Sequence, residues 1–146
     1  MPHNYKDILV AVDGSDASSA AFFKAVEIAK ANNATLVITH VIDTTVYTHS
    51  VLQVNYNEEL EVYAKELLHS FQKQAQSMGI HDVVVHLAYG SPKMKISKDI
   101  AKKYHIDLII CGATGHNRVE RFLIGSVSEH ITRHADVDVL VVRANK

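Results

Sequence analysis

Three features are scarce in this chain of 146 residues: cysteine, long apolar runs and an excess of charge of one sign. The single cysteine, Cys111, excludes an internal disulfide framework and fits a reducing compartment. No apolar run approaches the roughly 20 residues of a membrane span, and Met1–Asp7 lacks the basic and apolar segments of a signal peptide. We therefore expect a cytoplasmic protein with no membrane partner.

Charges of the two signs nearly cancel. Fifteen basic and sixteen acidic side chains give a net charge of −1, so bulk electrostatics do not indicate a nucleic-acid partner. No internal repeat, low-complexity tract or linker is visible. The length suits one domain over residues 1–146, which is long enough to bury about two-thirds of its unfolded surface.

Five apolar runs alternate with helix-like stretches. The runs are Ile8–Val12, Leu36–Val41, Val83–Ala88, Leu108–Cys111 and Val137–Val142. They are nearly continuous and rich in Val and Ile, which is typical of parallel strands covered on both faces. With right-handed crossovers, the alternation predicts a doubly wound α/β fold with a five-stranded parallel sheet and helices on both faces. Asp138 interrupts the last run, which favours an edge position where a second copy could pair.

Apolar residues at intervals of three or four predict the helices. The three clearest sets are Ala17, Ala21, Ala25 and Ile28; Leu60, Ala64, Leu67, Phe71, Ala75 and Met78; and Ile124, Val127, Ile131 and Ala135. Gly79 is suited to end the second helix, and Ser91-Pro92 to begin the third. Between the second strand and the second helix we expect a long loop, Asp43–Asn57, as a flap over a ligand or part of a dimer contact.

A group of glycines follows the fourth predicted strand. Gly112-Ala113-Thr114-Gly115 comes directly after it, and Gly125-Ser126 stands at the predicted start of the last helix. Glycine lets a phosphate approach main-chain N–H groups, and a helix N-terminus adds further donors and a favourable dipole. The intervening residues His116, Asn117, Arg118 and Arg121 could donate additional hydrogen bonds. The pattern predicts a site for an anionic ligand.

The position of this group supports the same interpretation. Open α/β sheets bind ligands at the carboxyl ends of their strands, where the winding direction reverses. Asp13 follows the first strand, Val41 ends the second, and Gly112 begins the loop after the fourth. A nucleoside could lie between the first two loops while its phosphates reach the third.

The spacing G-x2-G-x9-G-S resembles the ATP-binding signature of the universal stress proteins. It is read here as Gly112, Gly115, Gly125 and Ser126, and the opening Ile8–Ser15 is also similar to theirs. The resemblance extends over essentially the whole chain. It implies strand order 3-2-1-4-5 and a homodimer through the last strand.

The same resemblance implies which residues hold the nucleotide. Asp13 and the backbone of Val41 would hold the adenosine, and the glycines with Ser126 would hold the phosphates of ATP, together with Mg²⁺. The complete candidate site is Asp13, Val41, Gly112, Gly115, His116, Asn117, Gly125, Ser126 and Val127.

Several candidates also have a purely structural explanation. Gly112 and Gly115 could simply shape a tight turn, and Asp13 could start the first helix or its turn. Ser126 could be only an N-cap, because Ser126-x-x-Glu129 fits a capping box.

Two further groups invite a functional interpretation that the sequence does not favour. His130 and His134 lie one helical turn apart, but no third metal ligand is evident. Cys111, at the end of a predicted buried strand, is expected to be an inert core thiol.

The function that these patterns favour is nucleotide binding in a regulatory or stress-protective protein. One alternative is a slow ATP hydrolase or a phosphoryl or nucleotidyl transferase, although no Walker lysine is present. Another is an interaction protein without a nucleotide. A phosphoacceptor domain is disfavoured because Leu87–Ser91 lacks an aspartate, and a Rossmann dinucleotide site because no G-x-G-x-x-G follows the first strand.

Overall fold

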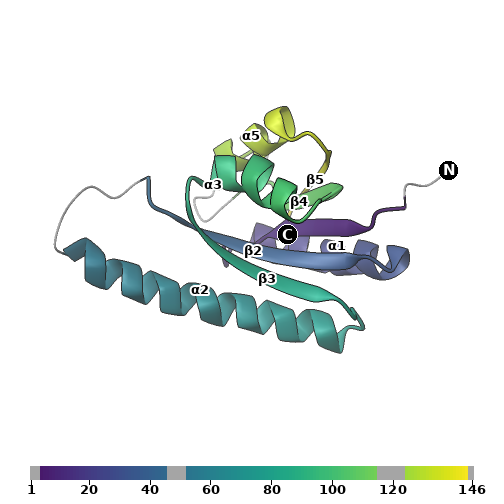
Figure 1. Cartoon of the computed structure of the whole chain (residues 1–146), viewed down its shortest axis with the longest axis horizontal. Coiled ribbons are helices and arrows are strands. Elements are labelled where there is room, and N and C mark those ends of the chain that lie inside the picture. The colour runs from purple at the N-terminus through teal and green to yellow at the C-terminus, as the bar shows by residue number, and fades with distance from the viewer. Residues whose placement is uncertain (1–3, 46–51, 115–123, 145–146) are drawn as a thin grey trace.

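The protein is built on one five-stranded parallel sheet (Figure 1). The computed structural model describes residues 4–45, 52–114 and 124–144. The strands are β1 (Asp7–Ala11), β2 (Thr35–Asp43), β3 (Val83–Gly90), β4 (Leu108–Gly112) and β5 (Asp138–Val142). They pair in the order β3-β2-β1-β4-β5, so the predicted doubly wound sheet and the edge position of the last strand are both confirmed.

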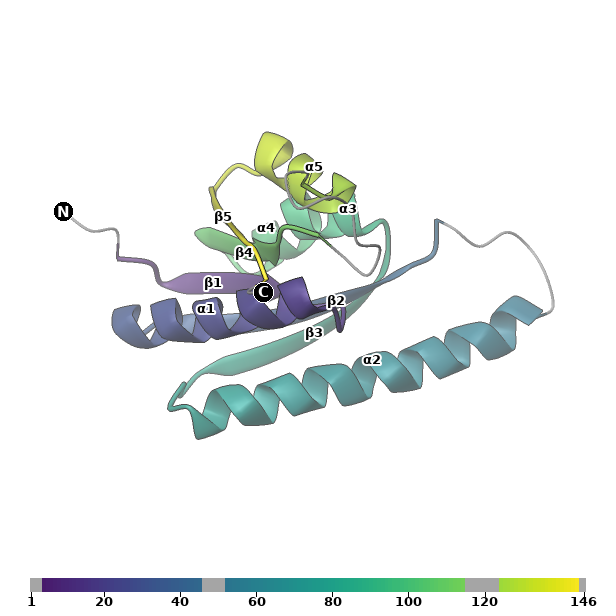
Figure 2. The same cartoon turned by 180° about the vertical axis from the view of Figure 1, so that it is seen from behind.

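The helices cover both faces of this sheet (Figures 1 and 2). They are α1 (Asp16–Asn32), α2 (Leu52–Ser77), α3 (Pro92–Met94), η1 (Lys95–Ile100), α4 (Ala101–Lys103) and α5 (Ser126–His134). The segments α3, η1 and α4 follow one another directly, forming a helix whose middle is π-helical. Within the described ranges, no helix is long and apolar enough to cross a membrane.

Successive side chains of each strand point to opposite faces of the sheet, and this divides the core into two layers. Ile8 and Val10 of β1 pack with Phe22 of α1 and other residues of α1 and α2. Leu9, between them, packs on the opposite face with Ile131 of α5 and residues of η1 and α4. Because both faces are buried, the strands read as continuous apolar runs rather than alternating ones.

The end of α2 illustrates how local chemistry fixes a boundary. Gly79 has φ +99°, a conformation that favours glycine, and its N–H donates to the Gln76 carbonyl at 3.1 Å. The Ile80 N–H donates to the Ala75 carbonyl, also at 3.1 Å. This is a Schellman motif, so the predicted role of Gly79 is confirmed.

The predicted bounds of the long loop, Asp43 and Asn57, are both wrong. The second strand continues through Asp43, and the Thr44 N–H still bonds to the Gly90 carbonyl of β3 at 3.2 Å. Helix α2 begins at Leu52 rather than near Leu60. Residues 46–51 lie outside the described part of the chain.

We expect the substitution Asp7→Asn to stabilise the fold at neutral pH. Burial raises the pKa of the Asp7 carboxyl, and the charge of Asp107 raises it further. A carboxyl with a raised folded-state pKa destabilises the fold while ionised, and this penalty disappears as pH falls below its unfolded pKa of about 4. The group is partly exposed, so the gain at pH 7 should stay below about 1 kcal/mol.

Urea unfolding of both proteins at pH 7 and near pH 4 measures this effect. The difference between them should shrink at the lower pH. An equal gain at both pH values would show that the charge is not the cause.

Candidate functional site

A cavity of about 600 Å³ lies at the carboxyl ends of β1, β2 and β4. This is the switch point of the sheet, where β1 and β4 are neighbours and the chain winds away in opposite directions. Its lining consists of Ala11, Val12, Asp13, Ser18, His40, Val41, Ile42, Asp43, Leu60, Tyr63, Pro92, Ile96, Cys111, Gly112, Thr114, Gly125, Ser126, Val127, Ser128 and Ile131. The volume falls within the range of small-molecule sites, about 300–1,000 Å³.

The structure brings six of the nine predicted site residues together around this cavity. They are Asp13, Val41, Gly112, Gly125, Ser126 and Val127. The other three, Gly115, His116 and Asn117, lie outside the described residues.

The apolar part of the lining comes from both the sheet and the helices. It includes Ala11, Cys111, Ile96 and Ile131, of which the last three are buried. Burial raises the pKa of the Cys111 thiol to about 12, so it stays protonated at neutral pH. This agrees with the expectation of an unreactive core thiol.

Strands β1 and β2 separate at the cavity. Their pairing runs to Ala11 and Thr39 and ends where the Val12 N–H donates to the Thr39 carbonyl at 2.9 Å. Strand β2 nevertheless continues beside β3 as far as Asp43. Val41 therefore lies inside β2 rather than at its end, beyond the last residue that pairs with β1.

The main-chain groups of Val41 face this gap. In a parallel strand, successive residues direct their N–H and C=O groups to opposite neighbours. The Thr35 N–H donates to the Lys6 carbonyl on the β1 side, whereas the Leu36 N–H donates to the Asp82 carbonyl on the β3 side. The main-chain N–H and C=O groups of odd-numbered β2 residues therefore point toward β1. Those of Val41 point into the space beyond the last β1 residue that pairs with β2.

Asp13 shapes the turn before α1. Its Oδ1 accepts hydrogen bonds from the Ser15 N–H at 2.9 Å and the Ser15 hydroxyl at 2.5 Å. Ser15, not Asp13, is the N-cap of α1. Asp13 also lines the cavity, so its structural role and its predicted role as a ligand are compatible.

Gly112 and Gly125, the two predicted site glycines within the described residues, allow neighbouring segments of the chain to pack closely. A Cβ at Gly112 would lie 2.8 Å from the main-chain carbon of Ala17 in α1. A Cβ at Gly125 would lie 3.2 Å from the Ala113 carbonyl oxygen. Neither glycine is among the described residues with positive φ, so the conformational freedom of glycine is not what these two positions require.

The start of α5 differs from the predicted capping box. Gly125 is the N-cap, Ser126 is the first helical residue, and no side chain caps the helix. The capping role considered for Ser126 is therefore wrong, since the helix begins one residue earlier than a Ser126 cap requires. Among the described residues, the N–H groups of Ser126, Val127 and Ser128 have no acceptor, as expected for a first turn.

Ser128 fastens this helix to the loop after β4. Its buried hydroxyl lies 2.9 Å from the Ala113 carbonyl oxygen and 3.0 Å from that of Gly125. The Gly125 N–H donates to the same Ala113 carbonyl. These bonds hold the N-terminus of α5 beside the end of β4.

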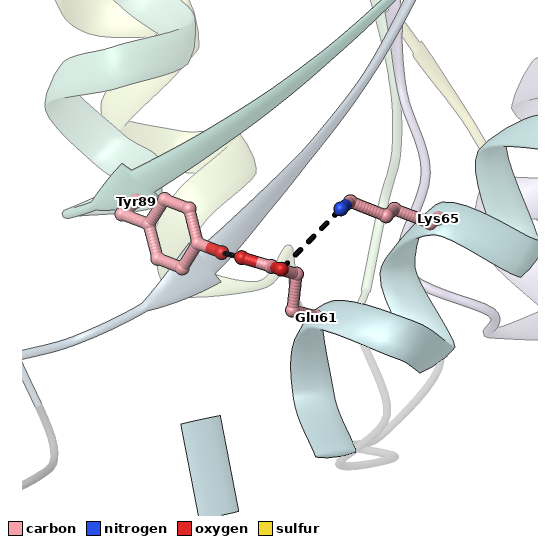
Figure 3. Close-up of polar contacts among 3 residues, drawn as sticks. All are labelled: Glu61, Lys65 and Tyr89. Carbon is pink, nitrogen blue, oxygen red and sulfur yellow. Dashed lines mark hydrogen bonds and ion pairs between the residues drawn. The ribbon is translucent and has the colours of Figure 1, made fainter. Parts of the chain in front are cut away.

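A polar cluster of Glu61, Lys65 and Tyr89 ties α2 to the end of β3 (Figure 3). The Tyr89 hydroxyl donates to Glu61, which also forms an ion pair with Lys65 at 3.3 Å. The hydrogen bond from Tyr89 and the charge of Lys65 lower the pKa of the Glu61 carboxyl. Glu61 lies between Leu60 and Tyr63 in the sequence of α2, and these two residues line the cavity.

The described residues do not support a metal site at His130 and His134. The two rings lie tilted by 36° with centroids 4.2 Å apart, but no group of three or more ligating side chains occurs in the described part of the chain. Burial, followed by the charges of His134 and two lysines, lowers the pKa of His130. An imidazole in this setting favours the neutral form.

Sequence reasoning missed many residues of this site, including three polar ones that shape it. His40 and Tyr63 line the cavity, and Ser128 fastens its helix. His40 and Tyr63 stand among apolar neighbours in a strand and a helix, with no spacing that marks them. Ser128 could have been noticed as a small polar residue on the inner face of an amphipathic helix.

Together, the parallel 3-2-1-4-5 sheet and the cavity at its switch point define a doubly wound α/β protein of the class that binds ligands at strand ends. The sequence profile described as "Universal stress protein family" matches residues 4–143. The chain belongs to the universal stress protein family.

Relatives and solved structures agree with this assignment. A universal stress protein of Staphylococcus haemolyticus is 46% identical over 143 residues, covering 97% of this chain and 87% of the relative. The structure of UspA from Lactobacillus plantarum superposes with a TM-score of 0.87 at 36% identity, covering 97% of this chain and 100% of that one. A universal stress protein in complex with cAMP superposes with a TM-score of 0.73 at 26% identity, covering 98% and 100%.

Proposed function

We propose that this chain is an ATP-binding universal stress protein that acts in regulation or stress protection. The observation that carries the proposal is one cavity lined both by Val41 and by the N-terminus of α5. The main chain of Val41 suits a base edge, and the helix N-terminus suits phosphates. In this proposal the protein is a cytoplasmic homodimer.

The main chain of Val41 offers a donor and an acceptor to the base. Adenine presents the complementary pair, an acceptor at N1 and a donor at N6, whereas guanine presents the reverse. The apolar residues Ala11 and Ile96, which also line the cavity, suit the faces of a purine ring.

The start of α5 offers N–H donors to the phosphates. The glycine N-cap leaves the N–H groups of Ser126 and Val127 without a competing side chain, and the helix dipole favours an anion. Asp13 and Asp43 are the carboxylates that line the cavity. They suit Mg²⁺, which proteins usually hold through one or two carboxylates together with the phosphates of a nucleotide.

Two further observations support the proposal. The relative solved with cAMP is a universal stress protein with an adenine ligand. For the dimer, β5 is an edge strand with β4 on one side, and on its other side it pairs with no strand in the described part of the chain. Such an edge can pair with a second copy.

Thermal unfolding with and without MgATP tests the proposal. Free ATP at about 30 times its Kd should add about 2 kcal/mol to the free energy of unfolding and raise Tm by about 4–8 °C. MgGTP at the same concentration is the control and should shift Tm much less. No shift with any adenine nucleotide would favour an interaction protein without a nucleotide.

A further inference from the structure

The side chain of His40 makes an unusual contact at the point where β1 and β2 separate. Its Nδ1 lies 2.7 Å from the main-chain oxygen of Val12. A carbonyl oxygen only accepts hydrogen bonds, so Nδ1 carries the proton in this contact. The ring is half-buried, and the ring of Tyr63 meets it nearly edge-on at 6.3 Å.

This contact replaces a regular hydrogen bond of the sheet. In a continuous parallel ladder the Val12 carbonyl would accept the next N–H of β2 that faces β1, which is that of Val41. Among the backbone hydrogen bonds of the described residues, none joins these two groups. The imidazole of His40 satisfies the Val12 carbonyl instead, and the ladder ends there.

We propose that His40 is a positioning residue: by occupying the Val12 carbonyl, its ring keeps the main-chain N–H of Val41 available to a purine edge. This inference rests on the proposed function. Without the ring, the Val12 carbonyl would be left unpaired beside a main-chain donor. Strands β1 and β2 would then close by one more hydrogen bond, and Val41 would lose its donor to the ligand.

The consequence is a specific role in base selectivity. Inosine triphosphate shares the sugar and phosphates of ATP but has a donor at N1 and an acceptor at position 6. With the Val41 main chain available, ATP should bind at least about tenfold more tightly than ITP, because a mismatched site leaves polar groups unpaired. A role of His40 in general stability would not change this ratio.

Isothermal titration with MgATP and MgITP tests the inference in three proteins: wild type, His40→Ala and His40→Asn. The asparagine amide can place an N–H close to the position of Nδ1. We expect His40→Ala to bind ATP about tenfold more weakly, with the ATP-to-ITP ratio falling below about three. His40→Asn should restore both values to within about threefold of wild type.

His86→Ala is the matched control. His86 is also a half-buried strand histidine, and its Nδ1 lies 2.8 Å from the Tyr104 hydroxyl, but it does not line the cavity. The ratio of ATP to ITP affinity in His86→Ala should equal that of the wild type. A wild-type ratio in His40→Ala, or no recovery in His40→Asn, would overturn the inference.

Amide hydrogen exchange separates this inference from the proposed function. In the protein without nucleotide, the Val41 amide should exchange about tenfold more slowly in His40→Ala than in wild type, because it gains the Val12 carbonyl as a partner. If the wild type binds neither nucleotide, the proposed function fails and this exchange rate decides the role of His40. An unchanged rate would overturn that role as well.

Discussion

Replacing Gly112 by valine is expected to lower the free energy of unfolding by about 3 kcal/mol or more. Already the first added carbon would lie 2.8 Å from the main-chain carbon of Ala17 and 2.9 Å from both its Cβ and its oxygen. These neighbours are mostly main chain, so no side-chain rotation can relieve the overlap. Helix α1 would have to move away from β4, which disturbs the core on that face.

Gly125→Ala is the control for this prediction. Its added carbon would lie 3.2 Å from the Ala113 oxygen, and the backbone at Gly125 has φ −62°, which any residue adopts. We expect a loss below about 1 kcal/mol in urea unfolding. If Gly112→Val unfolded at the wild-type urea concentration, the close packing of α1 on β4 would not be what requires this glycine.

Replacing Ser126 by glutamate should weaken ATP binding by at least about 100-fold without destabilising the protein. The substitution places a negative charge at the first residue of α5, on an exposed position that lines the cavity. Repulsion from the phosphates at a few ångströms is on the order of 1–4 kcal/mol per charge pair. The same charge interacts favourably with the helix dipole, by about 0.3–1 kcal/mol.

Ser126→Gln separates the effect of charge from that of size. It should bind ATP within about fivefold of wild type, because most of the predicted loss comes from the charge. Titration calorimetry gives the affinities, and thermal unfolding of the nucleotide-free proteins gives the stabilities. Unchanged affinity in Ser126→Glu would contradict the placement of phosphates at this helix.

Much of the fold could be predicted because its signals are local. The continuous apolar runs follow from burial on both faces, and Gly79 ends α2 by a motif that spans only a few residues. The start of α2 was missed because Leu52, Val54 and Tyr56 alternate with polar residues, which is not a helical period. The π-helical turns of η1 were missed because no spacing rule marks them.

The candidate site was partly predictable for a similar reason. Gly112, Gly125 and Ser126 form a recognisable spacing, but the packing that requires Gly112 involves Ala17, which is far away in sequence. His40 was missed because its partner is a main-chain carbonyl, which leaves no trace in residue types. The roles of Gly115, His116 and Asn117 stay predictions.

The strand order has a consequence for the growing chain. Strand β1 is synthesised before the other strands, yet in the folded protein it lies in the middle of the sheet, between β2 and β4. While the ribosome extends the polypeptide, β1 can pair with β2 early, but its other edge has no neighbour until Leu108–Gly112 has been made. During that interval Ile8, Leu9 and Val10, which are fully buried in the finished protein, form an apolar strand edge open to pairing with other chains.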